Sequence, residues 1–255
     1  MRSLRRVFVV SDNTAANRLY EFLGQDLIHD RLGALGFPHA RLVSRIGSSD
    51  VAANRRSTAV RVVDAEGGQR FARPAIESSV VRSFPYGEAR AGLGWLDGDR
   101  VIAGAHDFSA SNFLALGDMH TMLLALITPE AVPESQRWRI SESARLSVLT
   151  EMAHWPRESI DPSYAESDFP DRYAKFLLPQ GDANRWLRLY GKCGQAFGYL
   201  NDTQCVLDTR TGRQVLISAS IHVNADGIFN DDVYEYDDVG LPMLAALGQA
   251  ALDSA

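Results

Sequence analysis

The sequence has few of the residues that mark a disulfide scaffold, a metal site or a membrane protein. Of its 255 residues only two are cysteine, Cys193 and Cys205, and two cysteines do not make a disulfide framework. Six scattered histidines, none beside a cysteine pair, give no metal-ligand spacing, so we expect no metal and no other cofactor. No apolar run is long enough to cross a membrane. The run at 7–10 is too short for the core of a signal peptide.

Positive charge is also scarce. The 26 Lys and Arg residues face 32 Asp and Glu residues, which gives a net charge of −6. Nucleic-acid binding usually needs a basic stripe, so we expect no nucleic-acid partner. Lys175 and Lys192 are the only lysines. A GC-rich genome accounts for this bias, yet it makes each lysine worth inspecting. The composition, 45% hydrophobic and 23% charged, is that of a soluble globular protein, and we predict a single domain over residues 1–255.

The first half of the chain alternates between helix and hairpin patterns. Apolar residues at helical spacing and candidate caps predict helices, and alternating residues around Gly-containing turns predict hairpins. The predicted helices are 11–24, 26–36, 115–127 and 141–154, and the predicted hairpins are 58–71 and 96–102. The stretch 156–170, a Pro-bounded segment with aromatics, is a long loop, and 171–178 is a short helix.

The last third is predicted to be sheet and then helix. Strands at 186–197, 203–208 and 214–223 are separated by turns at 200–202 and 211–213, which indicates an antiparallel meander. An apolar helix at 239–252 carries Leu241, Leu244, Ala245 and Gly248 on one stripe, suited to lying across the sheet. The fold class is therefore α/β (α+β), an antiparallel sheet with helices on both faces.

Two short motifs carry the chemistry. Ser11-Asp12-Asn13 opens a helix, and Lys192-Cys193-Gly194 lies at the start of the strand pattern 181 positions later. Penicillin-recognising serine hydrolases combine Ser-x-x-Lys, Ser-Asp-Asn and Lys-Thr-Gly. Together with the flanking helices and the closing helix, this sequence resembles the class A β-lactamase-like serine hydrolases, with the β-lactamase/transpeptidase fold. The resemblance covers the part of the family that follows the nucleophile, so the sequence is interpreted as truncated before Ser-Asp-Asn.

The resemblance implies a role for each motif residue. Ser11 is the hydroxyl relay to the leaving group, and Lys192 supplies positive charge that favours a substrate carboxylate and polarises Ser11. Asn13 offers its amide to the acyl side chain of the substrate. Asp12 is structural and braces its own loop through backbone N–H groups. Gly194 lets the substrate backbone approach the strand, and Cys193 occupies the carboxylate-binding position.

Three departures from the family separate this sequence from a working β-lactamase. No serine stands three residues before either lysine, so the chain contains no Ser-x-x-Lys nucleophile. Cys193 replaces a hydroxyl residue. The long spacing between the two motifs indicates an insertion, and the hairpin-rich stretch 57–107 is the predicted one, placed where it could cover the site.

The predicted function is acyl transfer on a small-molecule or peptide substrate: a β-lactam or a D-alanyl-peptide, amide or ester. The chain as written is expected to be inactive, to depend on a missing N-terminal segment, and to belong to an exported, periplasmic enzyme although it shows no signal peptide. The alternative is a non-catalytic relative that binds a peptide or a partner chain. Two further alternatives stay open: Cys193 beside Lys192 as a low-pKa thiol nucleophile, and a Cys193–Cys205 disulfide across neighbouring strands.

Overall fold

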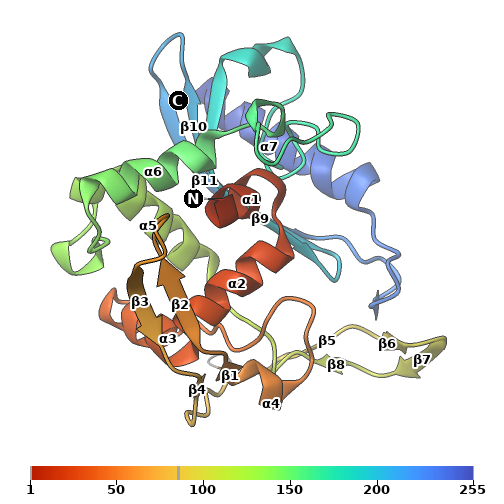
Figure 1. Ribbon diagram of the computed structural model, residues 1–255. Helices are drawn as coiled ribbons and strands as arrows, with labels where there is room; N and C mark the ends of the chain where they lie inside the picture. The colour runs from red at the N-terminus through yellow and green to blue at the C-terminus, as the bar shows by residue number, and fades with distance from the viewer. Residues whose placement is uncertain (1, 85–86, 255) are drawn as a thin grey trace.

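The three longest strands form one antiparallel sheet, and helices cover both of its faces (Figure 1). The computed structural model describes residues 2–84 and 87–254. The sheet has the order β11-β10-β9, so β10 is central and pairs with both neighbours. Its strands are β9 (Leu187–Ala196), β10 (Tyr199–Asp208) and β11 (Gln214–His222). The predicted meander and the α/β class are confirmed.

The helices follow the apolar periodicity of the sequence. Asp12 and Ser141 cap their helices through side-chain oxygens, which satisfy backbone N–H groups that have no helical partner. The helices are α1 (Arg2–Val10), α2 (Asn13–Leu23), α3 (Gln25–Ala34), α4 (Val51–Asn54), α5 (Leu116–Ile127), α6 (Glu142–Ala153) and α7 (Leu241–Ser254).

The two faces of the sheet build two cores, because side chains alternate along each strand. Leu189, Val206 and Ile217 face α7, where Leu244 packs against them. Tyr190, Cys205 and Leu216 face the other way and pack with residues of α5 and α6. On α7 the predicted stripe is confirmed: Leu244, Ala245 and Gly248 are buried, and Leu241 is half-buried against the same core. A Cβ at Gly248 would lie 2.0 Å from the Leu177 carbonyl oxygen, so this close approach requires glycine.

Short strands make up the hairpin-rich part of the chain. Most of them lie on the far side of α2 from the main sheet (Figure 1). Both predicted hairpins are confirmed, as the pairs β2–β3 and β6–β7. The parallel strand β12 adds to β6. These short strands are β1 (Arg56–Ser57), β2 (Val60–Val63), β3 (Gln69–Arg73), β4 (Ile76–Glu77), β5 (Arg90–Ala91), β6 (Gly94–Asp97), β7 (Arg100–Ala103), β8 (His106–Asp107) and β12 (Ile228–Phe229).

An aromatic cluster joins this hairpin region to the main sheet. Phe197, in the turn between β9 and β10, lies 5.5 Å from Trp95 and 5.6 Å from Phe108, measured between ring centroids. Phe229 packs edge-on against Phe108 at 5.0 Å. Because Phe197 follows the strand that carries Lys192, the hairpin region contacts the end of that strand.

The structure corrects the sequence-based prediction at three places. Residues 171–178 form turns and no helix, because the Leu177 N–H donates to the Asp202 carboxylate 2.9 Å away instead of to a helical carbonyl. The turn expected at 200–202 lies at residues 197–198, and Asp202 is fully buried inside β10. The first helix, α1, was not predicted at all: its segment reads as a basic stretch followed by a short apolar run.

Candidate active site

Ser11 sits in the short connection between α1 and α2, in a strained backbone conformation. Its φ is +52°, in the left-handed region that L-residues other than glycine rarely adopt. Such strain costs on the order of 1–3 kcal/mol and is concentrated at functional sites. In this conformation the Ser11 hydroxyl is bonded to Lys192 on β9.

Asp12 holds this connection in place. Its Oδ1 accepts a hydrogen bond from the Ala15 N–H at 2.6 Å and caps α2, while its Oδ2 accepts from Arg6 Nε at 3.1 Å. Burial works to raise the pKa of the Asp12 carboxyl, but the Ala15 N–H and the Arg6 guanidinium outweigh it and hold that pKa below its ordinary value. Asp12 is therefore ionised and ties the end of α1 to the start of α2.

Lys192 reaches Ser11 from β9 across 181 positions of sequence. Its Nζ donates to Ser11 Oγ at 2.6 Å and also to the Cys193 carbonyl oxygen. The bond is charge-assisted and partly buried, which makes it stronger than a bond between neutral groups. A hydroxyl held on an ammonium group can pass a proton to a neighbouring atom while the ammonium stabilises negative charge beside it.

Two other motif residues, Asn13 and Gly194, lie near the Ser11–Lys192 pair in sequence. Asn13 is exposed at the first position of α2. Gly194 is half-buried on β9, two positions beyond Lys192, and a Cβ built there meets nothing within 4 Å. Packing within the described residues therefore does not require glycine at 194. The outer edge of β9 forms no strand pair in the described part of the chain, so an extended ligand could add to it. The carbonyl oxygens of Leu189 and Cys193 already accept hydrogen bonds from the two lysines.

Cys193 lies on the opposite face of the strand from Lys192. Its thiol is 5% exposed and packs in the core beside Leu189. Burial raises its pKa to about 11, and the positive charge of Lys192 only partly offsets this. The thiol-nucleophile alternative, which needs a low pKa, is wrong. Cys205 is also a free, buried thiol, and it faces the other core, so the disulfide alternative is not realised either.

Three polar residues near Lys192 were missed by the sequence reading. Thr203 is its partner on β10, and the Thr203 hydroxyl is buried with no hydrogen-bond partner among the described residues. Next in the row, Ser218 on β11 pairs with Thr203, and its Oγ lies 3.0 Å from His120 Nδ1 on α5. The alternation of β11 places Ser218 on this face, but only the strand register reveals that it lines up with Lys192.

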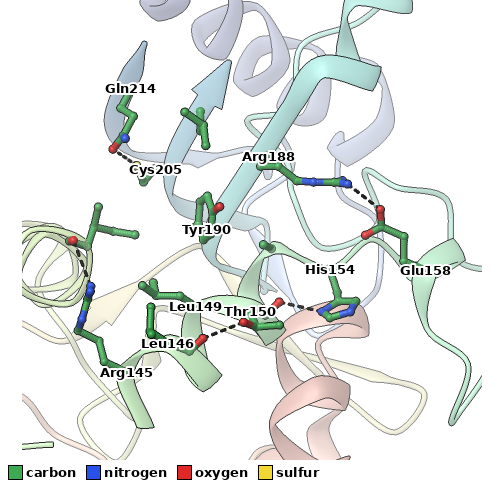
Figure 2. A pocket seen from close by; sticks show the side chains of 13 residues that line it. Arg145, Leu146, Leu149, Thr150, His154, Glu158, Arg188, Tyr190, Cys205 and Gln214 are labelled. Atoms are coloured by element: carbon green, nitrogen blue, oxygen red, sulfur yellow. Dashed lines mark hydrogen bonds and ion pairs between the residues drawn. The ribbon is translucent and has the colours of Figure 1, made fainter. Parts of the chain in front are cut away.

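A cavity of about 530 Å³ opens between α6 and the sheet, and it contains none of the predicted site residues (Figure 2). Several of its polar side chains are bonded to one another or to backbone carbonyls of its walls. Arg188 binds Glu158 at 2.8 Å, and Arg145 donates to the Leu126 carbonyl at 2.8 Å. His154 Nδ1 donates to the Thr150 carbonyl at 2.7 Å. Among the described residues that line it, no hydroxyl or thiol is bonded to a basic side chain, so Ser11 and Lys192 stay the candidate site.

The fold and this geometry define a class: a mixed α/β protein in which an edge strand presents a lysine to the serine of a helix-start loop. The model of the β-lactamase enzyme family matches residues 2–151, more than half of the chain. The chain therefore belongs to the β-lactamase enzyme family and is a hydrolase of β-lactamase type. The matched segment includes Ser11, Asp12 and Asn13 and ends before β9. No curated protein sequence gives a significant match. Within residues 2–84 and 87–254, no helix is long and apolar enough to span a membrane.

Proposed function

We propose that Ser11 and Lys192 are the proton-handling half of an acyl-transfer site in a class A-like serine hydrolase. The single observation that supports this is the 2.6 Å bond between Lys192 Nζ and Ser11 Oγ. Acyl transfer needs an acid to protonate the leaving nitrogen. In this role the Ser11 hydroxyl donates its proton to that nitrogen, and the Lys192 ammonium donates a proton to the Ser11 oxygen, which restores the hydroxyl and leaves a neutral lysine amine.

The proposed substrate is a β-lactam or a D-alanyl-peptide, amide or ester that lies along the outer edge of β9. The ammonium of Lys192 attracts the substrate carboxylate, and the exposed Asn13 amide binds the acyl side chain. Gly194 leaves room for the substrate backbone. Because the Cys193 thiol faces the core, its contribution is through its backbone at the strand edge. The hairpin insertion proposed near 57–107 contacts the end of β9 through Trp95 and Phe197.

The proposal places no Ser-x-x-Lys nucleophile within the 255 residues, and it therefore predicts that this chain by itself forms no acyl-enzyme. The missing Ser-x-x-Lys motif also favours a second candidate function, which is non-catalytic binding of a D-alanyl peptide or a partner chain at the same strand edge. By resemblance we also propose that the protein acts after export. The two functions share a binding site and differ in covalent chemistry, so one experiment addresses both.

The test combines binding with mass spectrometry. A fluorescent penicillin and a chromogenic cephalosporin are incubated with the protein, and intact mass and colour change are recorded. Noncovalent binding of penicillin and of a D-alanyl-D-alanine peptide is measured by saturation-transfer NMR. We expect binding without a covalent adduct, and weaker binding in Lys192→Ala than in Arg18→Ala, a matched loss of one exposed cation on α2.

Two results would overturn parts of the proposal. A covalent adduct on any serine of residues 1–255 would show that the chain carries its own nucleophile. Equal binding by the wild type and Lys192→Ala would show that the edge of β9 beside Lys192 is not the ligand site. Binding without an adduct supports the second function for this chain and leaves the assignment of Ser11 and Lys192 in place.

A further inference from the structure

The second lysine, Lys175, is fully enclosed in the protein. Lys175 is only 1% exposed. Lysines are almost never fully buried unless they are paired. Its Nζ donates to the Met152 carbonyl at 2.6 Å and to the Leu189 carbonyl at 2.8 Å. The ring of Trp155 lies against it, with 5.5 Å between Nζ and the ring centroid. An apolar residue here would avoid the cost of burying an ammonium group, so the two hydrogen bonds are the feature that needs explaining.

These two bonds join the end of α6 to β9. Met152 belongs to the last turn of α6, and Leu189 lies on β9 three positions before Lys192. A hydrogen bond two residues after Lys175 strengthens the same junction. The Leu177 N–H donates to Asp202 Oδ2, and Asp202 lies on β10 opposite Cys193. The segment around Lys175 is thus bonded to the helix, to β9 and to β10.

The same turn of α6 also holds α1. Glu151, which is 4% exposed, accepts two hydrogen bonds from Arg5, one from Nε at 2.8 Å and one from Nη2 at 3.0 Å. This two-point pairing fixes both the distance and the angle between the two groups. Since α1 leads directly into Ser11, the residues Glu151 and Met152 connect to Ser11 on one side and to the strand of Lys192 on the other.

The contacts therefore close a ring. It runs from Ser11 through α1 and Arg5 to Glu151, then through Met152 and Lys175 to Leu189 on β9, and back through Lys192 to the Ser11 hydroxyl. We propose that Lys175 is a positioning residue for the Ser11–Lys192 pair, because it sets where β9 lies relative to the helix that holds α1. Its value for catalysis rests on the proposed function; its effect on geometry can be tested without any substrate.

The scarcity of lysine provides the test. Lysine labelled with ¹³C and ¹⁵N at the ε position gives one signal from each of Lys175 and Lys192, and the wild-type signal that disappears in Lys192→Met is that of Lys192. In Lys175→Met, the methionine has an unbranched side chain of similar length, but it cannot donate either hydrogen bond. We expect the Lys192 signal of this variant to move by more than its line width, or to split, while far-ultraviolet circular dichroism stays unchanged.

Arg145→Met is the matched control. Arg145 Nη1 also donates to two backbone carbonyls, Leu126 at 2.8 Å and Ile127 at 3.3 Å, but at the first turn of α6 and outside the ring. Its loss loosens α6 at the other end and is expected to leave the Lys192 signal in place. If Lys175→Met fails to fold, Glu151→Gln tests the ring from its other branch, with the same shift expected.

The proposal is overturned if a folded Lys175→Met, or Glu151→Gln in its place, leaves the Lys192 signal unchanged. It is also overturned if Arg145→Met moves that signal as much, because the shift would then report general loosening. Failure of the proposed function is recognised separately: in that case Lys192→Ala binds penicillin as well as the wild type does, whatever the NMR signals show.

Discussion

The buried Lys175 makes a quantitative prediction about how stability depends on pH. Burial lowers its pKa from 10.5 to about 8, although the negative charge of Asp202 opposes the shift; the other charged or titratable groups facing it are Cys193, Arg188 and Asp171. Above pH 8 the folded protein has released this proton, whereas the unfolded chain keeps it up to pH 10.5. The unfolded state then binds more protons, so the stability contributed by this group rises with pH.

The magnitude follows from the pKa difference. Each unit of pKa shift is worth about 1.4 kcal/mol, so between pH 7 and pH 9 the rise is about 1 kcal/mol. Cys193 and Cys205 act in the opposite direction, because burial raises their pKa values to about 11 and the folded state keeps protons that the unfolded state loses above pH 9. Comparing the wild type with Lys175→Met removes the contribution of Cys205, whose pKa is raised by burial alone. It removes most of that of Cys193, where burial is the largest cause and the charge of Lys175 a smaller one.

The assay is urea unfolding at pH 7, 8 and 9, followed by tryptophan fluorescence and circular dichroism. The free energy of unfolding of the wild type minus that of Lys175→Met is expected to increase by about 1 kcal/mol from pH 7 to pH 9. Lys192→Met is the control and keeps the pH dependence of Lys175. A difference between wild type and Lys175→Met that stays constant over this range would refute the reasoning, because Lys175 would then titrate as an exposed lysine does.

Three further predictions use the same unfolding assay. Gly191→Ala should lower the free energy of unfolding by about 1–3 kcal/mol, because its Cβ would lie 1.9 Å from the Thr203 carbonyl oxygen, while Gly194→Ala, whose Cβ meets nothing within 4 Å, should be neutral; equal effects would contradict the strand register. Ser11→Gly should be more stable than Ser11→Ala, since both lose the hydroxyl and only glycine relieves the left-handed strain of about 1–3 kcal/mol, and both should weaken penicillin binding. A glycine variant less stable than the alanine variant would refute the strain. Cys193→Ser should cost about 1–3 kcal/mol, because it buries a hydroxyl among apolar side chains, and a neutral result would mean that the thiol is not enclosed.

Local patterns predicted most of the secondary structure. Apolar spacing, caps and Gly turns predicted both hairpins and the helices α2, α3, α5, α6 and α7. These signals lie within each segment and need no distant contact. The errors arise where distant residues decide. Asn201-Asp202 looks like a turn in sequence, but Asp202 is stabilised inside β10 by the Leu177 N–H and the Gln204 amide. The burial of Lys175 was not predicted, because nothing nearby in sequence reveals the two carbonyls that accept its hydrogen bonds.

The candidate site was predictable in a different way. The sequence reading placed Ser11 and Lys192 together through resemblance to a family, since no periodicity joins two residues 181 positions apart. It could not show that Cys193 turns into the core, because that depends on which face of β9 meets α7. Nor could it show Thr203, whose buried hydroxyl is recognised only from its pairing with Lys192.

A double-mutant cycle on Ser11 and Lys192 tests the central claim most directly. The free energies of unfolding of the wild type, Ser11→Ala, Lys192→Met and the double variant are measured at pH 7 by urea unfolding. A partly buried hydrogen bond from an ammonium group predicts a coupling energy of about 1–3 kcal/mol between the two positions. Additive effects, with a coupling below about 0.5 kcal/mol, would contradict the account, because the lysine of the edge strand and the serine of the helix-start loop would then not be bonded to each other.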